Sequence, residues 1–205
     1  MTVVPMDEVA TEIDRDSWHP MGMEASESYS VRFDRVVLGP EALVGEPADY
    51  ERAPWFTGGA SRFLAVQTGA LERLRDELAR WLRETRRDDD PIALARFGEI
   101  AVATTTALQW VTACAAAWDA FDVGPSDDRL GSLLLVVDGA RVAIERAALD
   151  IAERVERTAG ARGLLEPVPF GRLIRDLRMY LRQPAPDAAL QRVARATIDR
   201  TAEGV

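Results

Sequence analysis

The arginines near the carboxyl end of the chain are the side chains best placed to do chemistry. Arg175, Arg178 and Arg182 stand at i, i+3 and i+7 in "RDLRMYLRQPAPD", so they share one face of a predicted helix. A guanidinium row binds phosphate well, which makes it a candidate contact for the phosphate group of a ligand. The chain carries a net charge of -9, however, and a solvated face paired with acidic neighbours is the favoured interpretation.

Composition excludes several other kinds of chemistry. All 25 basic residues are arginine, which excludes Schiff-base catalysis and a Walker-type lysine. Cys114, the single cysteine, is predicted to pack inside a helix, and with His19 as the single histidine no metal site is expected. The acidic pI near 4.8 argues against nucleic acid and anionic membrane surfaces as partners.

No targeting segment is expected at the amino terminus. The first residues lack the basic stretch and apolar core of a signal peptide, and no uncharged apolar run is predicted to reach membrane-spanning length. The simplest expectation is a cytoplasmic protein without a membrane partner.

The periodicity of the chain changes near residue 45. "VRFDRVVL" at 31–38 predicts a strand, with a one-residue shift in its pattern that a bulge would explain. Beyond residue 58 the period is helical. Long helices are predicted at 59–86, 90–120 and 127–159, and shorter ones at 169–182 and 187–201. The fold class is therefore mainly α, an up-and-down helical bundle preceded by a small β segment, with residues 1–45 as the remnant of a β-domain and 46–205 as the helical domain.

The second long helix has two distinctive features. "DDDP" predicts its start, with Asp90 as the N-cap and Pro91 at the first helical position. From Ile100 to Trp118 the helix carries no charge, so we expect it to be central in the bundle or to face another subunit.

The order of four motifs resembles the carboxyl-terminal portion of acyl-CoA dehydrogenases. The motifs are "WHPMGMEASESYSVRFDRVVL" at 18–38, "ASRFLAVQTGALERL" at 60–74, "GARG" at 160–163 and "RD" at 175–176. The resemblance implies an FAD-dependent oxidoreductase acting on the CH–CH bond of an acyl-CoA, assembled as a homodimer or homotetramer. It also implies flavin contacts from Arg62, Gly160 and Gly163.

The chain departs from that family where catalysis is expected. The usual catalytic glutamate falls on Pro184, and the alternative base position is Ser61. Asp187 is the nearest carboxylate, although its position after a proline favours a helix N-cap over a base. Asp88 and Asp89 stand where the family has Phe-Gly, a flavin contact. The resemblance therefore assigns no catalytic residue.

Three functions remain open from the sequence. The first is a dehydrogenase-like flavoprotein or its carboxyl-terminal portion. The second is a non-catalytic helical subunit that forms an oligomer or joins the other half of a split flavoenzyme. The third is a flavin monooxygenase on the same fold, which needs no base to remove an α-proton. In all three, "WFTGG" at 55–59 either forms a wall of a ligand pocket or an ordered inter-domain loop.

Overall fold

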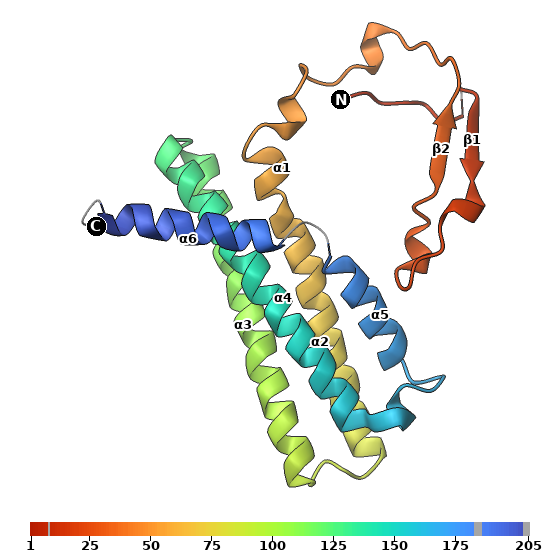
Figure 1. The fold of residues 1–205 in the computed structure, drawn as a ribbon, viewed down its shortest axis with the longest axis vertical. Coiled ribbons are helices and arrows are strands. Elements are labelled where there is room, and N and C mark those ends of the chain that lie inside the picture. The colour runs from red at the N-terminus through yellow and green to blue at the C-terminus, as the bar shows by residue number, and fades with distance from the viewer. Residues whose placement is uncertain (8, 183–185, 203–205) are drawn as a thin grey trace.

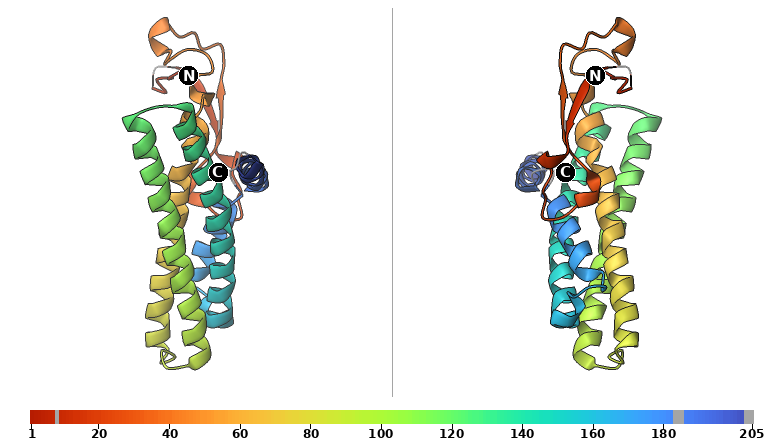
Figure 2. Two further views of the ribbon diagram at one scale, coloured as in Figure 1. Left: turned by 90° about the vertical axis from the view of Figure 1, so that its left-hand side faces the viewer. Right: turned by 90° about the vertical axis from the view of Figure 1, so that its right-hand side faces the viewer.

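The protein is a helical bundle with a small sheet held to one side of it (Figure 1). The computed structural model describes residues 1–7, 9–182 and 186–202. Three long helices, α2 (Ala60–Glu84), α3 (Pro91–Val123) and α4 (Asp127–Gly163), run alongside one another, as both side views in Figure 2 show. The short helix α1 (Trp55–Gly58) leads into α2, α5 (Phe170–Tyr180) packs on α2 and α4, and α6 (Pro186–Ala202) crosses α4. This confirms the predicted bundle.

The predicted start of α3 is confirmed by its capping geometry. Asp90 Oδ1 accepts hydrogen bonds from the backbone N–H groups of Ile92 at 2.9 Å and Ala93 at 3.2 Å. These bonds, that from Ala93 foremost, and the neighbouring Arg87 guanidinium hold the pKa of the Asp90 carboxyl below its usual value. Arg87 also donates to the carbonyl of Thr158 at 2.9 Å, so the α2–α3 turn is tied to α4.

The central helix is α4, so of the two expectations for α3 the place at the centre of the bundle does not apply to this chain, and the face towards another subunit stays a prediction. α4 packs against α2, α3, α5 and α6. Its buried residues recur along nearly its whole length and include Leu133, Val137, Ile144, Ile151 and Val155. α4 bends at Gly160, whose φ of 65° is a conformation that glycine adopts without penalty.

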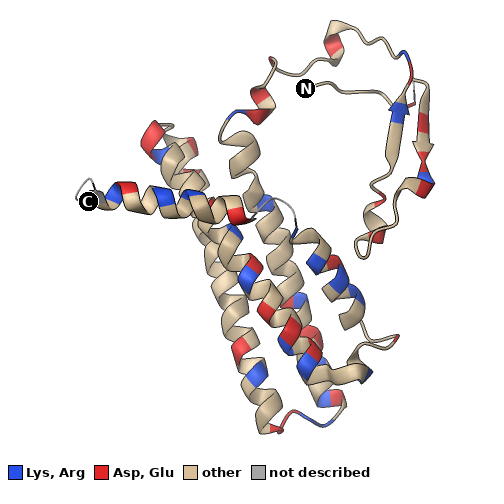
Figure 3. Cartoon of the chain, in the orientation of Figure 1, with Lys and Arg blue, Asp and Glu red and all other residues tan. Residues whose placement is uncertain are grey.

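α3 buries a single stripe of residues and leaves several large apolar side chains exposed, among them Ile92, Leu94 and Val102. Its buried residues are Ala93, Ile100, Thr104, Ala107 and Cys114, which make a single stripe facing α2 and α4. By length and composition α3 is apolar enough to cross a membrane, so the sequence expectation that no such run exists is wrong. One such helix is weak evidence for a membrane span. Figure 3 shows the middle of this helix free of charged residues.

Residues 1–7 and 9–53 form an arm that lies beside the bundle and joins it at α1 (Figure 1). The arm contains two antiparallel strands, β1 (Thr11–Asp14) and β2 (Ser30–Phe33), paired from Thr11 with Phe33 to Asp14 with Ser30. The predicted strand at 31–38 is therefore shorter than expected. Arg35 adopts a positive φ of 51°, which ends the extended conformation, and Val37 is 93% exposed.

The arm is bound to the bundle where two of the sequence motifs meet. The backbone N–H of Met23 donates to Asp176 Oδ1 on α5 at 2.6 Å. Gly22 is buried against the backbone of α5, where an added Cβ would lie 2.4 Å from the carbonyl oxygen of Arg175. The Met-Gly pair and the Arg-Asp pair, 153 residues apart, are therefore two sides of one contact.

Candidate functional site

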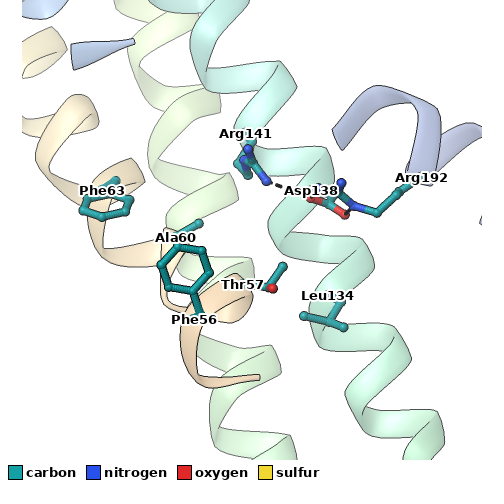
Figure 4. Close-up of a pocket in the computed structure, with 8 residues that line it drawn as sticks. All are labelled: Phe56, Thr57, Ala60, Phe63, Leu134, Asp138, Arg141 and Arg192. Atoms are coloured by element: carbon teal, nitrogen blue, oxygen red, sulfur yellow. Dashed lines mark hydrogen bonds and ion pairs between the residues drawn. The ribbon is translucent and has the colours of Figure 1, made fainter. Parts of the chain in front are cut away.

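A half-open cavity of about 420 Å³ lies between the α1–α2 corner, α4 and α6 (Figure 4). Its volume is in the range of small-molecule sites. The apolar wall is built by Phe56, Ala60 and Phe63 from the corner and by Leu134 from α4, with the hydroxyl of Thr57 among them. "WFTGG" therefore contributes a pocket wall, and it does so as a helical turn, not as a loop.

The α1–α2 corner is fixed by Trp118 of α3. The indole N–H lies 3.2 Å from the carbonyl oxygen of Gly58 and 3.1 Å from the hydroxyl of Ser61. The indole ring also occupies the space next to Gly58, where an added Cβ would come within 2.8 Å of it. Because this corner carries Phe56 and Phe63, Trp118 positions the aromatic wall from outside the cavity.

The far end of the cavity is charged. Asp138 of α4 has a side chain only 3% exposed, and its carboxylate accepts two hydrogen bonds of 2.6 Å from Nε and Nη2 of Arg192 on α6. Arg141, one turn along α4, donates to Asp138 Oδ1 at 3.2 Å. Burial lowers the pKa of the Arg141 guanidinium, while the Asp138 charge acts in the opposite direction.

This charged end was not among the sequence candidates. Its signal was the sequence "LLLVVDGARVAI" at 133–144, where Asp138 and Arg141 interrupt an otherwise uncharged stretch of a buried helix. Such charges are rarely buried unless they are paired. The partner on α6 lies 54 residues away, and no local pattern indicates it.

Two of the three arginines in the row make ion pairs with α4, as the sequence interpretation favoured; Arg178 lies on α5 and Arg182 just beyond its end. Arg178 lies 3.4 Å from Glu156, and Arg182 lies 2.6 Å from Glu145. The neighbouring Asp176 holds the arm. In this chain these side chains therefore connect α5 to its surroundings.

The three predicted flavin contacts do not come together. Arg62 is exposed in the first turn of α2, beside the cavity residue Phe63. Gly160 lies near the carboxyl end of α4, about 28 Å from Arg141 by the helical rise, and Gly163 lies beyond the bend at Gly160. Gly160 has open space around it, whereas Gly163 is buried against Ala159 and the ring of Phe170. The flavin contacts proposed for these residues stay predictions.

The predicted base positions have different surroundings. Pro184 lies outside the described residues. Asp187 is exposed in the first turn of α6, one residue past the start of the helix at Pro186, so it is not the N-cap that the sequence favoured. Ser61 donates its hydroxyl to the carbonyl of Gly58 at 3.0 Å, which is a structural bond at the corner.

Cys114 is a packing residue, as the sequence predicts. Its side chain is buried among α2, α3 and α4, and burial raises the pKa of its thiol to about 11. A thiol with this pKa is almost wholly protonated at neutral pH, which excludes it as a nucleophile.

Comparison with curated proteins finds monooxygenases. The dibenzothiophene monooxygenase of Mycolicibacterium goodii is 27% identical over 187 residues, covering 80% of this chain and 45% of that protein. A protein of the same name from Rhodococcus erythropolis is 28% identical over 191 residues, and a probable FMNH2-dependent monooxygenase from Pseudomonas putida is 28% identical over 181 residues. The chain spans about half the length of these curated relatives. No family model matches it.

Comparison with solved structures gives the same fold. Dibenzothiophene monooxygenase TdsC from Paenibacillus sp. A11-2 matches with a TM-score of 0.85 and 22% identity, covering 97% of this chain and 55% of that one. TdsC with bound FMN and indole matches with a TM-score of 0.84. A 3-HSA hydroxylase from Rhodococcus sp. RHA1 matches with a TM-score of 0.73 and 20% identity, covering 92% of this chain and 53% of that one. The helical bundle is therefore of the acyl-CoA-dehydrogenase-like kind found in flavin monooxygenases.

Proposed function

We propose that this chain forms the helical part of a flavin-dependent monooxygenase and binds a small aromatic substrate in the cavity between α1, α2, α4 and α6. The cavity carries the proposal, because its aromatic wall suits a flat apolar ligand. The relatives support the proposal, since they are named as monooxygenases and one matched structure holds indole.

The monooxygenase alternative therefore replaces the acyl-CoA dehydrogenase interpretation. None of the relatives or structures reported above is named as a dehydrogenase. Oxygen transfer also needs no carboxylate to remove an α-proton, so proline at position 184 is no obstacle. The cofactor proposed here is FMN in place of FAD, since the Pseudomonas putida relative is named as FMNH2-dependent and TdsC has been solved with FMN.

The described residues offer the two kinds of group that a flavin requires. Trp55, which does not line the substrate cavity, exposes 55% of its surface at the α1–α2 corner and provides an apolar plane for a ring system. Arg62 in the first turn of α2 exposes a guanidinium suited to phosphate. When bound, a reduced flavin supplies the electrons that split dioxygen, so that one oxygen atom enters the substrate and the other leaves as water.

This chain's own residues bind and enclose the substrate. Phe56 and Phe63 hold an aromatic ring by packing, and the Thr57 hydroxyl supplies a hydrogen bond that orients it. α6 covers one side of the cavity and is held there by the pair between Arg192 and Asp138, which limits the access of water.

Ligand binding and oxygen transfer test the proposal separately. Calorimetric titration of the purified chain with indole is expected to give saturable binding that Phe63→Ala weakens by about tenfold. Phe33→Ala is the matched control, since Phe33 is 46% exposed on the arm and does not line the cavity. Supply of reduced FMN and ¹⁸O₂ is then expected to add one labelled oxygen to indole. The absence of both indole binding and FMN binding would overturn the proposal.

A second proposal concerns assembly, and the exposed apolar face of α3 supports it. We propose that α3 forms the interface of a homo-oligomer, a dimer or a tetramer. Val102 is 69% exposed in the middle of the uncharged part of this helix, so Val102→Glu is expected to lower the mass measured by light scattering. Val37→Glu, on the arm and 93% exposed, is the control. A monomeric wild-type chain would refute this proposal.

A further inference from the structure

The charged end of the cavity contains more positive than negative groups among its described lining residues. Two guanidinium groups, those of Arg141 and Arg192, line the cavity together with one carboxylate, that of Asp138, while the other lining residues are uncharged. In a chain whose net charge is -9, this end is a local cationic spot at the bottom of an apolar pocket.

Arg192 holds Asp138 with one edge of its guanidinium. Nε and Nη2 make the two bonds to the carboxylate, and Nη1 is not among these donors. The side chain remains 49% exposed where it lines the cavity, although its partner Asp138 is almost wholly buried. A guanidinium with five N–H donors can bind a second acceptor while it keeps the first.

We propose that the cavity selects aromatic ligands that carry an anionic oxygen group, such as a carboxylate, sulfinate or sulfonate, and that Arg192 binds this group. The inference rests on the proposed function and names the substrate class for that site. The ligand's ring lies against Phe56 and Phe63, and its charged group points along α4 towards Asp138 and Arg192 (Figure 4). Arginine favours bidentate binding to groups that present two oxygen acceptors side by side, as a carboxylate does.

Other ligand classes fit this end of the cavity less well. A cation would be repelled by two guanidinium groups. A wholly apolar ligand would remove water from the N–H donors of Arg192 without replacing those hydrogen bonds, and sites of this kind discriminate strongly against ligands that lack the acceptor. An anionic oxygen group satisfies the donors and the charge together.

Calorimetric titration with a matched pair of ligands, indole and indole-3-carboxylate, tests the inference. The wild-type chain is expected to bind the carboxylate at least about tenfold more tightly than indole. Arg192→Gln is expected to reduce this preference, measured as the ratio of the two affinities, to less than about twofold. Arg195→Gln is the matched control, since Arg195 lies on the same helix and does not line the cavity.

A second variant separates ligand binding from loss of structure, since Arg192 also holds α6 in place. Asp138→Asn removes the competing carboxylate, so it is expected to tighten the binding of indole-3-carboxylate, a gain that partial unfolding does not produce. Equal affinities of the wild-type chain for the two ligands, or a preference that survives in Arg192→Gln, would overturn the inference and leave the proposed function standing. Binding of neither ligand, together with the absence of FMN binding, would overturn both.

Discussion

Replacing Gly22 with alanine should release the arm from the bundle. The added Cβ would lie 2.4 Å from the carbonyl oxygen of Arg175, and ordinary van der Waals contact begins at 3.4 Å. The arm must therefore move away from α5 by about 1 Å, because a helix backbone does not yield easily. That movement stretches the 2.6 Å bond between the Met23 N–H and Asp176 beyond hydrogen-bonding distance.

The size of the effect follows from the bond that is lost. A hydrogen bond to a charged group contributes about 1.5–3 kcal/mol, which corresponds to a roughly 10- to 100-fold weaker docking of the arm. Hydrogen–deuterium exchange is the assay. The amide of Met23 is expected to exchange faster by that factor in Gly22→Ala, while the amides in the core of α4 stay protected, since the arm contributes little to the bundle core.

A matched control lies on the helix to which the arm binds. Gly171 of α5 has its nearest neighbour for an added Cβ at 3.5 Å, an ordinary contact, so Gly171→Ala should leave the exchange of Met23 unchanged. Unchanged exchange at Met23 in Gly22→Ala would refute the reasoning, because it would mean that the close approach to Arg175 does not exist.

Three further predictions concern Gly58 at the α1–α2 corner, Cys114 in the core and Asp90 at the N-cap of α3. Gly58→Ala brings a Cβ within 2.8 Å of the Trp118 ring and should lower the free energy of unfolding, measured in urea, by about 1–3 kcal/mol. Gly69 has open space around it, so Gly69→Ala should raise the free energy of unfolding by about 0.5–1 kcal/mol. The reverse order of stability would contradict the packing. The Cys114 thiol, with a pKa of about 11, should react with an aromatic disulfide reagent at pH 8 only after denaturation, and prompt reaction in the native chain would show that it is exposed. The pKa of Asp90 is lowered in the folded chain, so its ionised carboxylate stabilises the fold above the ordinary pKa of 3.8, and this stabilisation is lost as the pH falls through the lower folded pKa. The melting temperatures of wild type and Asp90→Asn should therefore converge in acid and differ at pH 7.

The helices were predictable because their signals are local. The cap at Asp90 and the recurring leucines of α2 lie within one or two turns of one another, and the structure places α2 and α3 within three residues of the predicted bounds. β1 was missed because a four-residue strand with only one large apolar residue, Ile13, gives almost no periodic pattern. Its extended conformation depends on β2, which is 16 to 22 residues further along the chain at the paired positions.

The candidate site was predictable only in part. Phe56 and Thr57 were indicated by a cluster of aromatic, hydroxyl and glycine residues, but Phe63 reads as one more apolar residue of a helix. Asp138 and Arg192 meet only because α6 crosses α4, and helix crossing is a tertiary property. The two alternatives for α3 stayed open for the same reason, since an uncharged helix is equally consistent with a place in the core and with a face that another subunit covers.

The use of arginine at every basic position acquires a structural meaning from these contacts. Arg154 pairs with Asp150 on its own helix and with Glu99 on α3, while Arg87 reaches both Asp90 and the carbonyl of Thr158. Each side chain joins two elements because its donors are spread over a planar fork, whereas a lysine ammonium offers a single charged point. Arg192 uses the same property in the cavity, where one edge fixes α6 to Asp138 and the other remains for a ligand. Arg192→Lys should therefore keep the charge of the cavity and still lose most of the preference for indole-3-carboxylate. A lysine ammonium that pairs with Asp138 has no second set of N–H donors directed at the ligand.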